Sequence, residues 1–506
     1  MDSVYHRLIA STRLSSRASD RSIERPARPP LPPGPYLVIG IGRAGFAAAR
    51  ALVAEAGGGV VRAWDRYADA AQREKAAELR GLGVEVVLGG DGRGVLEGVR
   101  TVVKSPGVRP ENPVLTEAAR RGLGVVDEME VGWRLVPAPT VGVTGTKGKS
   151  TTSALCVALL AAHGLEPVLA GNTEYGPPLS ALALGEDPRS VVAEVSSFQA
   201  LYSEELAVDA AVLTNLTPEH LGWHGGMEAY ADAKRRLFVR GEWCVPLASL
   251  NLDDALGREL SREVEDRGGR VLTYGTADAA AYRIVECRWD LREGEVSVET
   301  PEGRVEMRTR LPGRHNAANA TAVLALGDGL GLPRELTLEA LAAAEPVPGR
   351  FEVLDVDRPF DVVVDLGFTI DAVDKALSTA RELAAARGGR LLTVLSVIGR
   401  SGPVIGREVG TQARRLSDRL FLCGSSYRGE PRLVTLAELK AGAEAVEGGS
   451  LEIVIDRPEA IAMALAEAGP GDVVMLVGRG PMAPEATDVR GGFRDLSDRR
   501  IVEELL

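Results

Sequence analysis

The feature that most constrains the fold is a glycine-rich turn between an apolar run and an alanine-rich stretch. Thr140-Val141-Gly142-Val143 predicts a buried strand, and residues 151–163 predict a helix. The turn between them reads Thr144-Gly145-Thr146-Lys147-Gly148-Lys149-Ser150. Its glycines let backbone N–H groups converge on phosphate oxygens, and a helix N-terminus favours negative charge. The pattern therefore predicts an α/β domain with a phosphate site at a strand end.

Two side chains in this turn have the chemistry that a nucleoside triphosphate requires. Lys149 would neutralise the β- and γ-phosphates, and the Ser150 hydroxyl would hold Mg²⁺. The spacing departs from a full Walker A motif because the earlier glycine, Gly142, falls one residue too early. A structural turn that happens to contain lysine is the alternative, and the flanking strand and helix argue against it.

A second strand, glycine turn and helix open near the N-terminus. Tyr36-Leu37-Val38-Ile39 precedes Gly40-x-Gly42-x-x-Gly45, and Asp65 follows twenty residues later. This spacing matches a dinucleotide-binding fingerprint, so a nicotinamide-dependent oxidoreductase is a rival hypothesis. The dehydrogenase hypothesis would leave the turn at residues 144–150 without a role.

The chain has 506 residues, enough for about three domains. Apolar strands alternate with helical stretches throughout, which predicts an α/β class with three domains. We expect a Rossmann-like first domain, a central P-loop ATPase-type domain with a mostly parallel sheet, and a Rossmann-like third domain. The predicted boundaries are a disordered Arg/Pro-rich tail at 1–34, then domains at 35–137, 138–346 and 347–506.

Composition excludes several classes of function. A net charge of -12 disfavours nucleic-acid binding, which needs clustered Lys and Arg. No stretch approaches the roughly 18 apolar residues that span a membrane. The four cysteines are widely separated, which fits a reducing compartment and disfavours a zinc site. We expect a cytoplasmic monomer without a nucleic-acid or membrane partner.

Five segments in order resemble motifs of the Mur ligases, and the resemblance extends over residues 36–506, closest to the D-glutamate-adding members. The turn at 144–151 is similar to their ATP loop. The others are Glu194-Val195-Ser196-Ser197-Phe198-Gln199, Asn215-Leu216-Thr217-Pro218-Glu219-His220, Ala231-Asp232-Ala233-Lys234 and Leu311-Pro312-Gly313-Arg314-His315-Asn316-Ala317-Ala318-Asn319. Glu219 stands where aspartate is usual in the family.

The resemblance implies a ligase that uses ATP and Mg²⁺ to join a carboxylate to an amine through an acyl phosphate. Ser150 and Glu194 would bind one Mg²⁺, while His220 and a carbamylated Lys234 would bind a second. Lys149, His220, Lys234 and Arg350 would be catalytic. The implied ATP-binding set is Gly145, Thr146, Lys147, Gly148, Lys149, Ser150, Thr151, His315, Asn316, Arg350 and Asp365.

The implied partners are a UDP-linked muramoyl precursor and an amino acid. The implied substrate-binding residues are Gly42, Asp65, Ser105, Asn172, Ser196, Thr369 and Arg400. The third domain departs from the family pattern: D-glutamate ligases have lysine at Gly367, and diamino-acid ligases have histidine at Phe368. The segment Cys423-Gly424-Ser425-Ser426-Tyr427-Arg428 stands in place of a diamino-acid-selecting motif, whereas the region after Val477 resembles the tail of the diamino-acid ligases.

These features favour addition of D-glutamate to UDP-N-acetylmuramoyl-L-alanine during peptidoglycan precursor synthesis. Two other hypotheses remain open. One is a ligase for a different acceptor or amino acid, as in specialised metabolism. The other is a degenerate paralogue that binds nucleotide without turnover.

Overall fold

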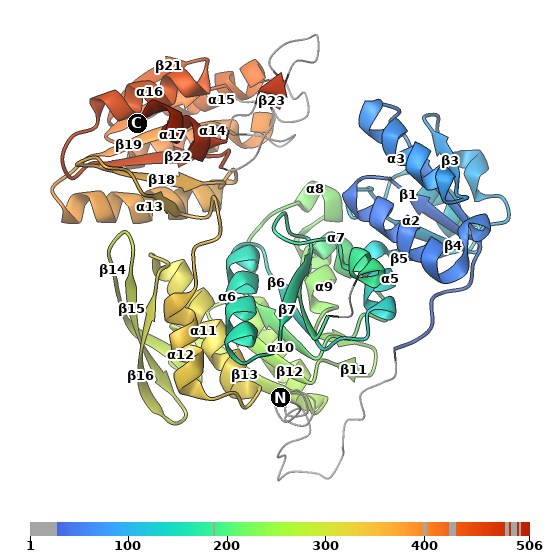
Figure 1. Ribbon diagram of the computed structural model, residues 1–506. Coiled ribbons are helices and arrows are strands. Elements are labelled where there is room, and N and C mark those ends of the chain that lie inside the picture. The colour runs from blue at the N-terminus through green and yellow to red at the C-terminus, as the bar shows by residue number, and fades with distance from the viewer. Residues whose placement is uncertain are drawn as a thin grey trace. The chain divides into compact units, whose positions relative to one another are not determined.

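The computed structural model describes residues 28–185, 188–397, 402–424, 432–480, 485–486, 493–494 and 497–506 (Figure 1). The chain divides into two compact units. The first holds the described residues up to Glu286 together with 297–307 and 318–342, and the second holds 287–296, 308–317 and the residues from 343 onward. Both units are α/β, so the predicted fold class is confirmed. No helix in the described part of the chain is long and apolar enough to cross a membrane.

The first sheet is five-stranded and parallel, in the order β3-β2-β1-β4-β5. Its strands are β1 Tyr36–Ile39, β2 Val61–Asp65, β3 Glu85–Leu88, β4 Thr101–Lys104 and β5 Gly124–Asp127, and its helices are α2 Arg43–Ala56, α3 Ala70–Gly81 and α4 Pro113–Arg120. The strand order reverses between β1 and β4. Ligands of such sheets bind past the carboxyl ends of the strands at this reversal, where Gly40 and Ser105 follow.

The central sheet has nine strands, in the order β16-β15-β14-β13-β12-β9-β6-β8-β7. The strands are β6 Thr140–Thr144, β7 Pro167–Gly171, β8 Ser190–Glu194, β9 Ala210–Leu213, β12 Leu247–Asn251, β13 Arg270–Gly275, β14 Tyr282–Trp289, β15 Gly294–Thr300 and β16 Gly303–Thr309. Strand β6 lies between β8 and β9, with Val143 opposite Glu194 and Thr144 opposite Leu213. Three strand ends therefore meet at one edge.

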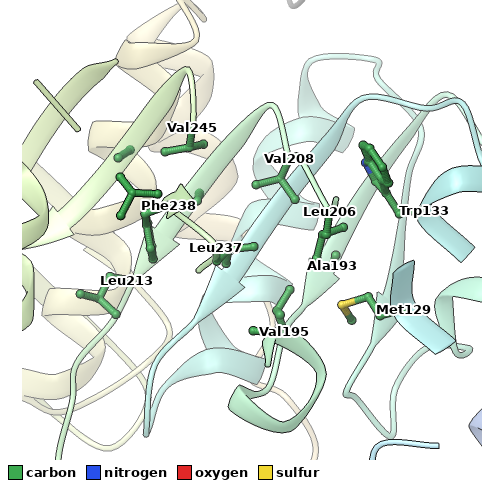
Figure 2. Packing of buried hydrophobic residues seen from close by; sticks show 14 of the residues in the cluster. Met129, Trp133, Ala193, Val195, Leu206, Val208, Leu213, Leu237, Phe238 and Val245 are labelled. Carbon is green, nitrogen blue, oxygen red and sulfur yellow. The ribbon is translucent and has the colours of Figure 1, made fainter. Parts of the chain in front are cut away.

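The helices around this sheet begin with α5 Glu128–Leu135, α6 Lys149–Ala162, α7 Ser197–Ala200, α8 Leu221–His224 and α9 Met227–Arg235, and continue with α10 Ala255–Asp266, α11 Arg314–Gly329 and α12 Arg334–Ala343. Helix α5 directly follows the first sheet, yet its Met129 and Trp133 pack with Ala193 and Val195 in the central apolar cluster (Figure 2). Asp127 caps α5 by accepting from the Met129 N–H. The first and central domains thus share a buried junction.

The second unit holds a six-stranded sheet in the order β17-β18-β22-β19-β20-β21. Its strands are β17 Glu352–Leu354, β18 Asp361–Asp365, β19 Leu391–Leu395, β20 Arg419–Cys423, β21 Ser450–Val454 and β22 Val473–Val477, and its helices are α13 Ile370–Ala386, α14 Gly402–Leu416, α15 Arg432–Glu444, α16 Arg457–Glu467 and α17 Asp498–Leu505. Only β17 pairs antiparallel within the described pairings of this sheet. Apolar clusters cover both faces, as expected of buried parallel strands.

Residues 28–34, the described part of the predicted tail, lie against the first domain and its junction. The Arg28 guanidinium stacks on Trp133 at 5.1 Å and donates to the Trp133 carbonyl at 2.7 Å. The Thr101 hydroxyl donates to the Pro33 carbonyl at 2.9 Å. These contacts hold residues 28–34 against the first domain.

Candidate functional site

The loop between β6 and α6 has a backbone that only glycine allows at two positions. Gly145 has φ +148° and Gly148 has φ +82°. A Cβ at Gly145 would lie 1.8 Å from the Thr214 hydroxyl, and one at Gly148 would lie 2.6 Å from the Asn319 side-chain oxygen. Gly148 is the N-cap of α6 and has no side chain to cap it, so the first N–H groups of the helix face the loop, as an anion site needs.

Lys149 curls back over this loop. Its ammonium donates to the Gly145 carbonyl at 3.1 Å and to the Thr146 carbonyl at 3.0 Å. The charge therefore stands directly above the backbone groups that would cradle phosphates. The adjacent Ser150 is half-buried at the start of α6.

A second loop, residues 214–220, packs along the phosphate loop. The Thr146 hydroxyl accepts from the Thr217 N–H at 3.0 Å, and the Lys147 N–H donates to the Asn215 side chain at 3.0 Å. The Lys147 ammonium pairs with the Glu219 carboxylate at 2.8 Å. This loop ends at His220, whose φ of +55° is rare for a non-glycine residue.

His220 faces a ring of charges. Burial lowers the pKa of His220; the charge of Glu219 opposes this shift, and Lys147, Lys149 and Lys234 reinforce it. Its imidazole is therefore held neutral, the form in which a ring nitrogen binds a metal. Its side chain remains 45% exposed, so it can be reached from solvent.

Lys234 is fully buried on α9 beneath the phosphate loop. Its Nζ donates to the Gly145 carbonyl at 2.6 Å and lies 4.7 Å from the centre of the Tyr230 ring. Burial, reinforced by Lys149, lowers the pKa of Lys234 well below its usual range. A neutral amine at this position can act as a nucleophile, which an ammonium cannot.

Glu194 ends β8 and is 3% exposed. Its charge raises the pKa of Lys234, so the two side chains are electrostatic neighbours. The Asn172 N–H donates to the Glu194 carbonyl at 2.8 Å. Ser196 instead forms a capping box with Gln199 at the start of α7, so its hydroxyl is engaged within the turn.

The structure thus brings Lys149, Glu194, His220 and Lys234 around one loop. Among the described residues, no group of three or more His, Cys, Asp or Glu side chains is arranged to hold a metal. Mg²⁺ usually takes one or two protein carboxylates and completes its shell with phosphate oxygens and water. A donor set of one hydroxyl, one carboxylate and one imidazole fits an ion that is bound together with nucleotide.

The glycine turn of the first domain is organised by Asp65 and Ser105. Asp65 accepts from the Ile41 N–H at 2.8 Å, and the Ser105 hydroxyl accepts from the Gly45 N–H at 3.1 Å. A Cβ at Gly45 would meet the Gly40 carbonyl at 1.8 Å, whereas one at Gly42 meets nothing within 4 Å. The space at Gly42 is where a ligand phosphate can approach the backbone.

Residues of the second unit form a separate group. Asp365 accepts from the Phe351 N–H at 2.8 Å and the Gly367 N–H at 2.7 Å, and Thr369 caps α13. A Cβ at Gly367 would lie 2.6 Å from the Asp365 carboxylate, so a lysine would require this turn to shift.

Three further predicted residues lie in this unit, and a fourth is not among the described residues. Burial lowers the pKa of His315 to about 4, and the nearby Lys375 adds to the shift. The Asn316 side chain donates to the Pro312 carbonyl at 2.8 Å, and Arg350 is half-buried. Arg400 falls outside the described residues.

Sequence reasoning missed several residues that build this site. The Tyr230 hydroxyl lies 3.1 Å from the Thr146 hydroxyl, and His224 lies 2.9 Å from the Ser197 hydroxyl. Tyr230 precedes Lys234 by four residues, one helical turn, which could have indicated a shared face. Asn319 lies under Gly148 within the motif already noted, but no spacing rule indicated that contact.

Three family models match the chain in order. The Mur ligase MurD-like N-terminal domain matches residues 35–127, the Mur ligase middle domain matches 143–327, and the Mur ligase glutamate ligase domain matches 349–480. A UDP-N-acetylmuramoyl-L-alanyl-D-glutamate–2,6-diaminopimelate ligase from Chromobacterium violaceum is 31% identical over 76% of this chain and 81% of its own. A UDP-N-acetylmuramoylalanine–D-glutamate ligase from Thermobifida fusca is 34% identical over 76% of this chain and 80% of its own.

Among solved structures, a UDP-N-acetylmuramate-alanine ligase from Thermotoga maritima superposes with a TM-score of 0.59 at 22% identity. The match covers 93% of this chain and 99% of that one. At this identity the similarity establishes a shared fold.

Proposed function

Because the chain belongs to the Mur ligase family, whose members are ATP-dependent amide-bond ligases, we propose that it adds D-glutamate to UDP-N-acetylmuramoyl-L-alanine. The match of residues 35–127 to the MurD-like N-terminal domain carries this proposal. That domain holds the glycine turn at the strand reversal, where a nucleotide-linked acceptor would bind. The 34% identity to a D-glutamate ligase supports the same acceptor.

The reaction needs two transfers. A carboxylate oxygen of the acceptor attacks the γ-phosphorus of ATP and ADP leaves, which gives an acyl phosphate. The amine nitrogen of the amino acid then attacks the carbonyl carbon, and phosphate leaves as the amine loses a proton. Both steps accumulate negative charge, so Lys149 and the N–H groups at the start of α6 would stabilise them.

The metal-binding residues in this proposal are Ser150 and Glu194 for one Mg²⁺, and His220 with modified Lys234 for a second. Bound Mg²⁺ would supply positive charge opposite the transferring phosphoryl group. Lys234 suits carbamylation because burial lowers the pKa of its amine, which favours the neutral form: the nitrogen adds to CO₂, a proton leaves, and an anionic oxygen donor results. The hydrogen bond to Gly145 would hold that side chain under the loop.

The second unit would supply further nucleotide contacts and the amino-acid site. We assign Arg350, His315, Asn316 and Asp365 to ATP, and Thr369 with Arg400 to the amino acid. A guanidinium can bind a carboxylate bidentately, as the side chain of D-glutamate would require.

Phosphate release measured across a panel of UDP-muramoyl acceptors and amino acids tests the proposal. Release only with UDP-N-acetylmuramoyl-L-alanine and D-glutamate is the expected result. Release with a diaminopimelate or another pair would favour a different amino acid, which the 31% identity to a diaminopimelate ligase makes the second candidate. Absence of phosphate release with every pair would indicate a paralogue that binds nucleotide without turnover. Lys149→Ala should abolish release with the active pair.

A further inference from the structure

Lys147 and Glu219 join the phosphate loop to the loop that carries His220. We propose that they are a positioning pair: Lys147 acts through Glu219 to hold His220, rather than as a phosphate ligand. The inference rests on the proposed function, because it concerns the same reaction centre. The proposal gives Glu219 a role in holding His220. It also changes the expected role of the Lys147 side chain from binding ATP directly to holding Glu219.

The main chain of Lys147 is fixed on both sides by the neighbouring loop. Its N–H donates to the Asn215 side-chain oxygen at 3.0 Å, and its carbonyl accepts from the Asn215 side-chain nitrogen at 2.9 Å. The Thr214 hydroxyl donates to the same carbonyl at 2.6 Å. With the backbone held this way, the Lys147 side chain extends along the second loop to Glu219.

Glu219 sits immediately before the strained residue of that loop. His220 has φ +55°, and such a conformation persists only where the surroundings determine it. The Glu219 side chain is 16% exposed, and its carboxylate lies 3.9 Å from the His220 ring nitrogen Nε2. The ion pair therefore anchors the backbone one residue from the histidine.

Electrostatics favours persistence of the ion pair between Lys147 and Glu219 when nucleotide binds. If Lys147 turned toward a phosphate, the largely buried Glu219 carboxylate would lose its partner beside a new anion. Lys149 already stands over the loop and can neutralise the phosphates without that loss.

The test compares Lys147→Met, Glu219→Gln and the double variant for binding of a fluorescent, non-hydrolysable ATP analogue, with EDTA and across a Mg²⁺ titration. We expect affinity in EDTA to stay within about twofold of wild type in Glu219→Gln and in the double variant, which leave no unpaired carboxylate beside the nucleotide. The Mg²⁺ concentration for half-maximal tightening should rise about tenfold in each single variant and no further in the double. Lys147→Arg should restore the wild-type value.

An exposed lysine–glutamate pair on α15, Lys440 and Glu444, provides the matched control. Lys440→Met with Glu444→Gln should leave both binding curves unchanged. Weakened binding in EDTA that persists in the double variant, where the Glu219 charge is also absent, would show that Lys147 is a phosphate ligand and overturn the proposal. Additive Mg²⁺ shifts in the double variant would also overturn it.

Glu219→Asp keeps the charge and shortens the reach by one methylene, so it tests the pair even if Glu219→Gln fails to fold. We expect an intermediate Mg²⁺ shift of about threefold, and a wild-type Mg²⁺ curve would contradict the pairing. Neither acceptor nor amino acid is present in these titrations. A failure here is therefore distinct from a failure of the D-glutamate assignment.

Discussion

Two lysines of the first unit are inaccessible to solvent, and each lies against a tyrosine ring. Lys104 Nζ is 4.8 Å from the Tyr202 ring centre, and Lys234 Nζ is 4.7 Å from the Tyr230 ring centre. They differ in their charged neighbours. Lys104 ends β4 opposite Asp127 on β5 and pairs with that carboxylate at 3.1 Å.

Lys234 donates instead to the Gly145 carbonyl, and Lys149 is the strongest charged influence on it. Burial lowers the pKa of both lysines, but Asp127 opposes the shift at Lys104, whereas Lys149 deepens it at Lys234. The same residue type at the same burial therefore forms a buried ion pair in one place, whereas in the other it is the proposed site of carbamylation. The neighbouring charges determine which role a buried lysine has.

Lys234→Met should produce the largest change in activity. We expect phosphate release to fall about a thousandfold. In the proposed mechanism the modified Lys234 binds a Mg²⁺, and without it the site loses positive charge opposite the transferring phosphoryl group. The free energy of unfolding should change by less than about 1 kcal/mol, because none of the ion pairs between described residues involves Lys234. Coupled phosphate assays and urea denaturation measure the two quantities.

Lys234→Ala leaves space for a small carboxylate such as acetate or formate, which should restore part of the phosphate release. Full activity in either Lys234 variant would refute the assigned role.

Lys104→Met should give the opposite result. Removing the ammonium leaves the fully buried Asp127 carboxyl without its partner, so we expect the free energy of unfolding to fall by about 3–5 kcal/mol. The variant that remains folded should release phosphate at close to the wild-type rate. Urea denaturation provides the measurement.

Asp127→Asn in the Lys104→Met background provides the control, because asparagine can still cap α5. The double variant should recover part of the lost stability. A Lys104→Met protein of wild-type stability that has lost phosphate release would reverse the comparison.

Sequence patterns predicted the structural features that are formed by residues close together in the chain. The strand, turn and helix at residues 140–163 followed from apolar runs and glycines, and the structure has them as β6 and α6. The spacing of Gly40, Gly42 and Gly45 indicated a nucleotide but not which one. A dinucleotide fingerprint and a UDP site use the same turn.

Contacts between distant segments were not predictable from these patterns. Lys104 meets Asp127 only because β4 and β5 pair in register, and Lys147 meets Glu219 across 72 residues of sequence. The departure at Gly367 was noticed in the sequence, but the closeness of the Asp365 carboxylate to that glycine is a matter of turn geometry. Charged residues that pair across long sequence separations follow no periodic pattern, so the sequence alone does not indicate which of them meet.

The junction around Lys104 also predicts a pH dependence of stability that arises from a buried carboxyl. Glu128 is fully buried next to Asp127 and accepts from the Ser180 N–H and hydroxyl, and burial raises its pKa to about 7. Between the unfolded value near 4.5 and this value, the native state binds more protons than the unfolded state. Glu128 should therefore contribute a decrease in the free energy of unfolding as pH rises across that window, by up to roughly 3 kcal/mol.

Urea denaturation at pH 5 and pH 8 tests this, with Glu128→Gln as the control. Glutamine retains an acceptor for Ser180 and does not titrate, so the free energy of unfolding of the wild type should fall relative to that of the variant between pH 5 and pH 8. An equal slope in both proteins would place the responsible group elsewhere.

A third lysine, which is exposed, should show the smallest effect on stability and activity. Lys440 lies on the surface of α15, 48% exposed, with Glu444 one helical turn away at 3.6 Å. Lys440→Met should change the free energy of unfolding by less than about 0.5 kcal/mol and leave phosphate release unchanged, because water already solvates both charges. The substitution is the same as at Lys104 and Lys234, so side-chain shape is held constant while burial and partner vary. A loss of stability in Lys440→Met comparable to that in Lys104→Met would mean that removing any lysine destabilises this acidic chain. The burial of the Lys104–Asp127 pair would then not explain the effect at Lys104.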